Sequence, residues 1–323
     1  MSKFSDLGNA LYSGERSFDF IGKRKYFYGV AGVMVVLSFI LPFLLHSGFN
    51  FGIEFKGGSE FRVAGVAAQS QSIATDAVHA VVPEAEATVT KVGTDSIRVQ
   101  TRQLEDEVSE EVRQALAEAY DIPAASVASS FVGPNWGADV TGKALSGLVT
   151  FVVLAAVLMA LYFRTAKMSI AAVAALVHDL LITAGVYGTL GFEVTPAAVI
   201  GFLTILGYSL YDTVVVFDKI RENTFEVEFS EKSTFASQVN LAINQTLVRS
   251  VNTSVVAVLP VAAILFIGAS LLGAGTLRDI SLALFIGIVI GTYSTIFIAA
   301  PLYSHLREGE SKYAKAAAKI QAK

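Results

Sequence analysis

The stretch VTPAAVIGFLTILGYSLYDTVVVF, from Val194 to Phe217, decides the class of fold. It is apolar over the roughly 20 residues that a helix needs to cross a bilayer. Five more apolar runs have this property, and they lie near Phe27 to Leu45, Ala144 to Phe163, Met168 to Leu190, Val251 to Leu272 and Ile280 to Tyr303. The sequence therefore predicts a polytopic α-helical membrane protein with six transmembrane helices.

The composition of the whole chain agrees with that interpretation. Hydrophobic residues make up 53% of the 323 residues and charged residues only 16%, whereas soluble domains carry about 25% charged residues. The mean hydropathy is +0.57. These values exclude an ordinary soluble enzyme. The sequence contains no cysteine, which excludes disulfides, thiol catalysis and metal sites with cysteine ligands.

Lysine and arginine residues indicate which ends of the helices face the cytoplasm. Five precede the first apolar run and five follow the last: Lys3, Arg16, Lys23, Arg24 and Lys25, and Arg307, Lys312, Lys315, Lys319 and Lys323. Because cytoplasmic segments are enriched in these residues, both termini are predicted to be cytoplasmic. The expected organisation is a cytoplasmic segment 1–26, a first transmembrane helix 27–47, an extracytoplasmic domain 48–138, the other five helices 139–304 and a cytoplasmic tail 305–323.

The long loop from roughly Ser47 to Gly137 has the composition of a small soluble domain. Alternating apolar and polar residues predict strands near residues 61–66, 87–92, 97–101 and 125–131. Helical periodicity is found at residues 71–82 and after the acidic cluster that begins at Glu105. The order strand, helix, strand, strand, helix, strand is the ferredoxin-like pattern. We expect a small α+β ferredoxin-like domain between the first and second transmembrane helices.

Ionisable residues inside the apolar runs are the strongest functional signal, because each is costly in hydrocarbon unless it is paired or functional. Asp212 lies seven residues before Lys219 in the fourth run, which places it about 10 Å inside the cytoplasmic end at 1.5 Å per residue. A polar stripe is predicted to share its face of the helix and to point into the bundle. The stripe consists of Thr204, Tyr208 and Ser209.

Further polar residues lie in neighbouring runs. The fifth helix carries Arg249 just before its apolar run and Thr253 within the run, and the third run carries His178 and Asp179. Burial disfavours a charged carboxylate, whereas a nearby guanidinium favours it, so Asp212 beside Arg249 is a candidate proton carrier. A pair that only fixes the register of two helices is the alternative. For His178 and Asp179 a structural role is open as well.

Residues Gly137 to Lys143 match the G-x-x-x-x-G-K spacing of a nucleotide-binding loop. The next residue is Ala144, where such a loop needs a serine or threonine to hold Mg²⁺. The stretch also opens a predicted transmembrane helix on the extracytoplasmic side, where ATP is absent. We therefore expect no ATPase activity, no cofactor and no bound metal, and an energy source other than ATP.

Five motifs together point to one family. They are FGIEFKGG (51–58), VGP (132–134), ALVHD (175–179), GYSLYDTVVVFDKIREN (207–223) and NQTLVRS (244–250). With these motifs the chain resembles the SecF family, the smaller membrane subunits of the bacterial SecDF protein-export complex. The resemblance implies one six-helix half of a resistance-nodulation-division bundle in the bacterial cytoplasmic membrane, with SecD supplying the other half.

The resemblance also implies a function. Such complexes use the proton-motive force to assist the translocation of unfolded exported polypeptides through SecYEG, and YajC and YidC are further candidate partners. Asp212 and Arg249 match the aspartate and arginine of the family's proton relay. The expected coupling ion is H⁺, with Na⁺ as the alternative, and no nucleic-acid partner is expected.

Two other functions fit parts of the sequence. A stand-alone transporter of small molecules or ions from the same superfamily would need both six-helix halves, and this chain has one. An intramembrane aspartyl protease would use two catalytic aspartates on neighbouring helices. Tyr211-Asp212 matches half of such a signature, but the companion Gly-x-Gly-Asp is missing. The sequence favours the export accessory.

Overall fold

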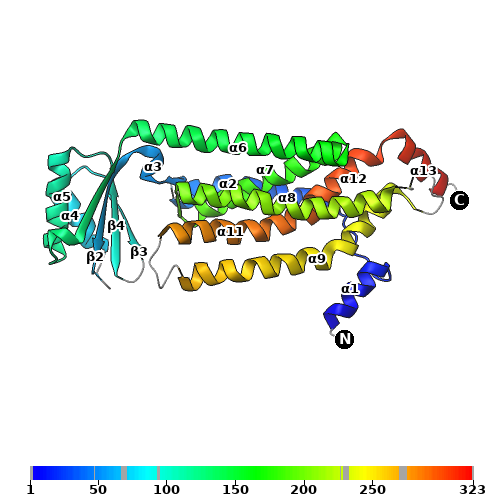
Figure 1. Cartoon of the computed structure of the whole chain (residues 1–323), viewed down its shortest axis with the longest axis horizontal. Coiled ribbons are helices and arrows are strands. Elements are labelled where there is room, and N and C mark those ends of the chain that lie inside the picture. The colour runs from blue at the N-terminus through cyan, green and yellow to red at the C-terminus, as the bar shows by residue number, and fades with distance from the viewer. Residues whose placement is uncertain are drawn as a thin grey trace.

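The computed structural model describes residues 3–46, 48–66, 71–92, 95–225, 227, 233–268 and 275–321. Six helices in these ranges are long and apolar enough to cross a membrane. Figure 1 shows them side by side in one bundle, with a small domain at one end and both termini toward the other. The prediction of a multi-pass helical protein is confirmed. The predicted boundary at residue 47, the end of the fifth run at 269–272 and the tail residues 322–323 lie outside the described ranges.

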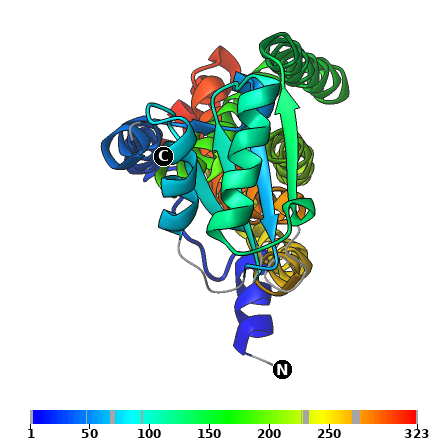
Figure 2. The ribbon, with the colours of Figure 1, turned by 90° about the vertical axis from the view of Figure 1, so that its left-hand side faces the viewer.

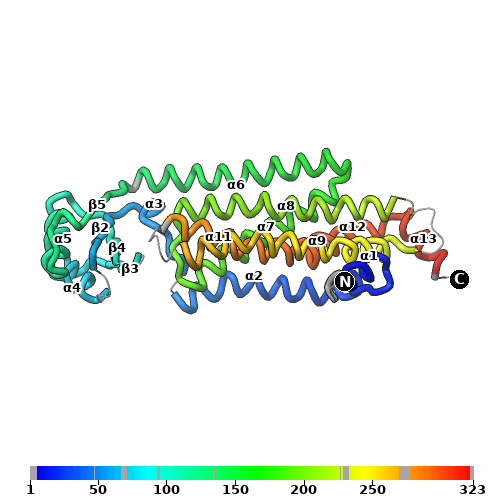
Figure 3. Tube along the Cα trace, turned by 60° about the horizontal axis from the view of Figure 1, so that its bottom comes forward, coloured from blue at the N-terminus to red at the C-terminus, as the bar shows by residue number. Residues whose placement is uncertain are grey.

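The membrane helices follow the apolar runs. They are α2 (Arg24–His46), α6 (Pro134–Phe163), α7 (Ala166–Thr189), α8 (Pro196–Thr224), α9 (Phe235–Ala263) and α11 (Gly275–Ser294). Two π-helical turns extend the last two: Ile264–Gly268 continues α9, and Thr295–Ala299 joins α11 to α12 (Ala300–Glu308). Helix α6 lies at the edge of the bundle (Figure 3), and half of its apolar side chains are exposed.

The apolar run from Val251 covers only part of the fifth membrane helix, because α9 begins at Phe235. An apolar run marks only the part of a helix that crosses hydrocarbon, and the polar turns before it can be helical too. Asn240 and Asn244 on these turns each accept a backbone hydrogen bond at 2.8 Å, from Phe20 and Phe18 respectively. The α9 extension therefore anchors the segment that precedes α2.

The small domain lies between α2 and α6. It consists of β2 (Gly58–Ala64), α4 (Gln71–Val81), β3 (Thr88–Val92), β4 (Ser96–Thr101), α5 (Asp106–Ala119) and β5 (Val127–Val132). The strands form one antiparallel sheet in the order β3-β4-β2-β5. These strands and helices are found where the sequence predicts them.

The two faces of this sheet have different contacts. Phe61, Val63, Ile97 and Val99 are buried in a core with residues of α4 and α5. Figure 2 looks onto the domain and shows these two helices in front of the strands. Successive residues of a strand point to opposite faces, so Glu60, Arg98 and Gln100 lie on the face toward the membrane helices.

A short connection attaches the sheet to the bundle. After α2, strand β1 (Asn50–Phe51) pairs in parallel with β6 (Glu193–Val194), which joins α7 to α8. Helix α3 (Ile53–Lys56) follows and ends at Gly57 and Gly58, whose φ angles are 78° and 151°. A Cβ on Gly58 would lie 2.5 Å from the Thr101 carbonyl oxygen, so only glycine fits between α3 and β2.

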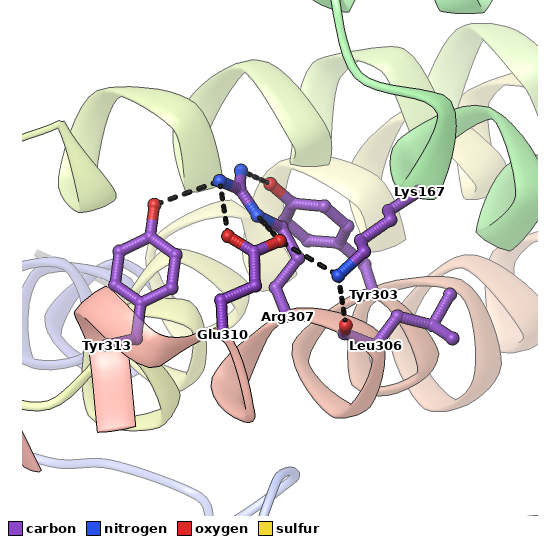
Figure 4. A network of polar contacts seen from close by, with 6 residues as sticks. All are labelled: Lys167, Tyr303, Leu306, Arg307, Glu310 and Tyr313. Carbon is purple, nitrogen blue, oxygen red and sulfur yellow. Dashed lines mark hydrogen bonds and ion pairs between the residues drawn. The ribbon is translucent and has the colours of Figure 1, made fainter. Parts of the chain in front are cut away.

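Polar contacts join several elements at the end of the bundle that holds the termini (Figure 4). The ammonium of Lys167 donates to the Leu306 carbonyl at 2.8 Å and to Glu310 at 2.9 Å. Arg307 donates to the hydroxyls of Tyr303 at 2.6 Å and Tyr313 at 3.0 Å. These bonds join α12 and the turn after it to the first turn of α7, and join α12 to α13 (Ser311–Gln321). Helix α1 (Lys3–Ser13) packs against α9 (Figure 3). Gln245 of α9 donates to the Tyr12 carbonyl at 3.1 Å.

Candidate functional site

Asp212 lies buried in the middle of the bundle on α8. The Ser250 hydroxyl of α9 donates to its Oδ1 at 2.9 Å. Its other oxygen, Oδ2, is buried and has no hydrogen-bond partner among the described residues. A buried carboxylate oxygen without a donor is unfavourable. Oδ2 is therefore the atom at which this site can accept a proton or another cation.

Hydroxyl groups from three helices converge beside Asp212. Ser254, one turn along α9 from Ser250, donates to the Ser250 carbonyl at 2.9 Å and is hydrogen-bonded to Thr292 of α11. The Tyr208 hydroxyl of α8 lies 3.4 Å from the Ser254 hydroxyl. These hydroxyls lie between Asp212 and α11, but Ser254 bonds to the backbone carbonyl of Ser250 rather than to its hydroxyl, so the hydrogen bonds do not form a continuous proton path.

A second buried carboxylate lies on α7, beside α8. Asp179 of α7 is fully buried, and the Ser209 hydroxyl of α8 donates to its Oδ2 at 2.6 Å. The His178 Nδ1 lies 3.4 Å from Oδ1. The other ring nitrogen of His178 and the Tyr293 hydroxyl are buried without partners among the described residues. Since Ser209 and Asp212 are both buried on α8, this helix connects the two acidic groups.

The predicted pair of Asp212 with Arg249 is not formed. Arg249 is exposed on α9, and the adjacent residue, Ser250, contacts the carboxylate instead. One residue turns the direction of a side chain by about 100° around a helix axis. The sequence alone therefore indicated the helix that faces Asp212, but not that Ser250 makes the direct contact. The Ser250 and Ser254 spacing of four residues was the signal that could have identified the buried face.

The polar stripe is buried only in part. Ser209 is buried and Tyr208 partly buried, but Thr204 is exposed, so the prediction that it faces the bundle is wrong. Its hydroxyl donates to the Ile200 carbonyl at 2.7 Å, a bond that lets a threonine face outward. Thr253 on α9 is also partly exposed. Tyr211 is 57% exposed, and its phenol therefore points away from the buried carboxylate beside it.

A third polar cluster joins the sheet to the membrane helices, and the sequence analysis missed it. Glu193 of β6 forms an ion pair with Arg98 of β4 and accepts a hydrogen bond from Gln100 at 2.8 Å. Gln100 also donates to Glu60 at 3.1 Å. Burial raises the pKa of Glu193 above its usual value, although Arg98 and Gln100 act in the opposite direction. The connection between α7 and α8 is thus held to the sheet of the small domain through one buried carboxylate.

The first turn of α11 belongs to the same junction. The carboxylate of Asp279 accepts a hydrogen bond from the Thr195 hydroxyl at 2.8 Å, and its backbone carbonyl accepts one from the Tyr187 hydroxyl. Thr195 is also the N-cap of α8. Helix α8 also carries Asp212. Thr195 therefore connects the helix of the candidate site to α11, and the α7–α8 connection joins it to the sheet.

We expect Arg98→Ala to destabilise this junction more at pH 8 than at pH 5. Without the guanidinium, the pKa of Glu193 rises further. At low pH the Glu193 carboxyl is then neutral, and the variant loses little free energy of unfolding. At high pH Glu193 is a buried charge without its partner. Because the pair is partly exposed, we expect the free energy of unfolding to fall by about 2 kcal/mol at pH 8. Thermal unfolding of the purified protein at both pH values measures it, and Arg102→Ala on the same side of the sheet is the control.

Equal destabilisation by Arg98→Ala at the two pH values would contradict this assignment of Glu193. So would equal effects of Arg98→Ala and Arg102→Ala.

Comparisons with known proteins assign the family. The model for the protein export membrane protein SecD/SecF, C-terminal, matches residues 111–309, and the SecD/SecF GG motif matches residues 43–64. The protein translocase subunit SecF of Streptomyces coelicolor is 44% identical over 96% of this chain and 82% of that protein. The chain belongs to the SecF family. The SecF of Mycobacterium tuberculosis H37Rv is 42% identical over 92% of this chain and 69% of that protein.

Solved structures of family members share the fold. A crystal structure of SecDF, a translocon-associated membrane protein from Thermus thermophilus, superposes with a TM-score of 0.75 at 31% identity and covers 91% of this chain. SecDF in a super-membrane-facing form gives 0.63 at 30% identity and covers 94%. The chain spans only 39% and 40% of those two SecDF chains. The matched GG motif contains Gly57 and Gly58, which the close turn before β2 requires.

The described residues contain no cluster of three or more histidine, aspartate or glutamate side chains placed to hold a metal ion.

Proposed function

We propose that the chain is the SecF-type subunit of a Sec translocase accessory, and that binding and release of a proton at Asp212 couples the proton-motive force to the translocation of exported polypeptides. The observation that carries the proposal is the buried Oδ2 of Asp212, which has no partner among the described residues while Oδ1 is held by Ser250. The names of its relatives, protein translocase subunits, support the role in export.

The arrangement in the membrane is part of the proposal. The basic residues near both termini favour cytoplasmic termini in the bacterial cytoplasmic membrane, which would place the small domain outside. Its sheet order β3-β4-β2-β5, with both helices on one face, supports a ferredoxin-like fold.

SecD is the proposed partner for the exposed polar face of α8 and α9. Tyr211, Arg249 and Asn252 are exposed on these helices, although polar groups facing lipid are unfavourable. A second six-helix half would cover them, and it would bring Arg249 into a protein environment near Asp212. SecYEG, YajC, YidC and unfolded polypeptides are further proposed partners.

The energy available supports the participation of a second carboxylate. One proton that crosses 100 mV releases about 2.3 kcal/mol, while a complete switch between two states needs about 5.5 kcal/mol. Asp179 accepts a hydrogen bond from Ser209, which lies three residues before Asp212 on α8. We assign Asp179 and His178 to the relay for this reason. A sodium ion could use the same oxygens, so the coupling ion is H⁺ or, alternatively, Na⁺.

ATP hydrolysis has no support. Residues 137–143, which match the spacing of a nucleotide-binding loop, lie inside the continuous helix α6. A helix has its backbone N–H groups bonded internally beyond the first turn, so it cannot wrap around phosphates as a loop does.

Ser250→Ala should weaken gradient-dependent export without abolishing it. The change removes one hydrogen bond to a carboxylate, worth about 1 kcal/mol or about a fivefold effect. The assay is translocation of a preprotein into inside-out vesicles with and without an ion gradient. Ser281→Ala is the matched control, because Ser281 is buried on α11 but bonds only to its own helix, at the Leu277 carbonyl. Full activity of Ser250→Ala would show that this hydroxyl does not hold the working form of Asp212.

Co-purification tests the proposed function itself. The tagged chain, extracted in mild detergent from a host cell that makes its natural partner, should bring down a second, homologous six-helix subunit. Vesicles that lack the chain should lose the gradient-dependent part of preprotein translocation. A homo-oligomer that moves small molecules, together with unchanged translocation, would instead favour a stand-alone transporter.

A further inference from the structure

Two adjoining cavities lie where the membrane helices meet the small domain. The first has a volume of about 400 Å³ and lies among α3, α6, α7 and α8, with walls formed mainly by Leu145, Leu148, Val199 and Leu203. The second has about 510 Å³ and lies between α3 and the sheet. Phe51 and Lys56 line both. The two cavities thus share one wall.

The cavities differ in chemistry. Apart from Lys56, the first is lined by apolar side chains and by Thr141, whose hydroxyl already donates to the Gly137 carbonyl. Charged side chains line the second: two cations, Lys56 and Arg102, and two carboxylates, Glu84 and Glu86. All four are exposed, and none forms an ion pair within the part of the chain that the structure describes. The combined site therefore suits a molecule with an apolar chain and a head of both charges.

The size and lining of the apolar cavity decide between a lipid and a polypeptide. Its volume is in the range of small-molecule sites, roughly 300–1,000 Å³, whereas a helix with side chains is about 10–12 Å wide and does not fit. An extended peptide would bury N–H and C=O groups where the walls offer almost no partners, at a cost of several kcal/mol per group. An acyl chain has no such groups. Leu145 is 60% exposed on α6, so the wall is open toward the bilayer.

We propose that the two cavities bind one zwitterionic phospholipid. One of its two acyl chains occupies the apolar cavity between α6 and α8. Its phosphate contacts Lys56 and Arg102, and its ammonium contacts Glu84 and Glu86. The lipid would lie between the membrane helices and the small domain, against α3 and β1. This site is separate from the relay at Asp212 and does not depend on it.

Native mass spectrometry of the full chain, delipidated and then titrated with phosphatidylethanolamine, tests the proposal. We expect one tightly held lipid per chain. Lys56→Glu should weaken its binding at least about tenfold, because a charge-assisted contact to the phosphate is replaced by repulsion. Ala144→Phe should block it by filling the apolar cavity. Lys143→Glu is the matched control, since Lys143 lies at the same level of α6 but lines neither cavity.

Three results would overturn the proposal. Equal lipid retention by the wild type, Lys56→Glu and Ala144→Phe would indicate surrounding bilayer lipid only. Equal affinity for phosphatidylglycerol, whose head has no ammonium, would remove the role of Glu84 and Glu86. Displacement of the lipid by an apolar signal-sequence peptide at matched concentration would make the site a polypeptide site. Thermal unfolding of each variant confirms that it is folded. If Ala144→Phe does not fold, Lys56→Glu still tests the proposal, because Lys56 is exposed.

Discussion

Asp212→Asn is expected to abolish the gradient-dependent part of preprotein translocation. In vesicles that contain the chain and its partner, the rate should fall to that measured with the ion gradient collapsed. An amide has the shape of the carboxylic acid and can still accept the Ser250 hydrogen bond, but it cannot gain or lose a proton at physiological pH. The substitution therefore removes the chemistry of the site and keeps its packing.

The control for this variant is Asp218→Asn on the same helix. Asp218 lies nearer the end of α8, where it accepts a hydrogen bond from the Tyr162 hydroxyl at 3.0 Å, and it is only partly buried. The same chemical change there should leave gradient-dependent translocation intact. If both variants behave as the wild type does, Asp212 is a structural residue and the relay must lie elsewhere.

Gly185→Val is expected to cause a large loss of stability. Gly185 of α7 packs against Ser38 of α2, and a Cβ on it would lie 2.6 Å from the Ser38 Cα. The obstacle is backbone, so no side-chain rotation relieves it, and the two helices must separate. We expect a loss of about 3 kcal/mol, measured as a lower midpoint of thermal unfolding in detergent.

Gly147→Val on α6 is the matched control, because a Cβ there meets nothing within 4 Å. It should unfold near the wild-type temperature. A similar loss in both variants would mean that valine itself, rather than the close approach of α2 and α7, destabilises the helices.

The sequence was sufficient for the membrane helices and for the elements of the small domain. Long apolar runs leave few alternatives, and alternation along β2 and β4 separates Phe61 and Val63 from Glu60. It also identified Asp212, because an acid in an apolar helix is rare. The turns of α9 before Asn244 were missed, since the polar Asn240 there binds a distant loop rather than lipid.

Contacts between elements could not be derived from one sequence. The rotation of α9 about its axis determines whether Arg249 or Ser250 contacts Asp212. A shift of one residue, about 100°, exchanges the two. The ion pair of Glu193 with Arg98 joins residues 95 positions apart, and no local pattern signals it. No local pattern signals the two cavities that Lys56 lines either, because they form only where α3, α6 and the sheet come together.

Infrared difference spectroscopy of the SecDF-type complex in lipid tests the central claim most directly. When the pH is lowered across the working range, a carbonyl band of a protonated carboxylic acid should appear in the wild type and be absent in Asp212→Asn. The band should persist in Asp218→Asn. If the wild-type and Asp212→Asn spectra are identical at every pH, Asp212 does not change its protonation, and proton coupling at this residue is contradicted.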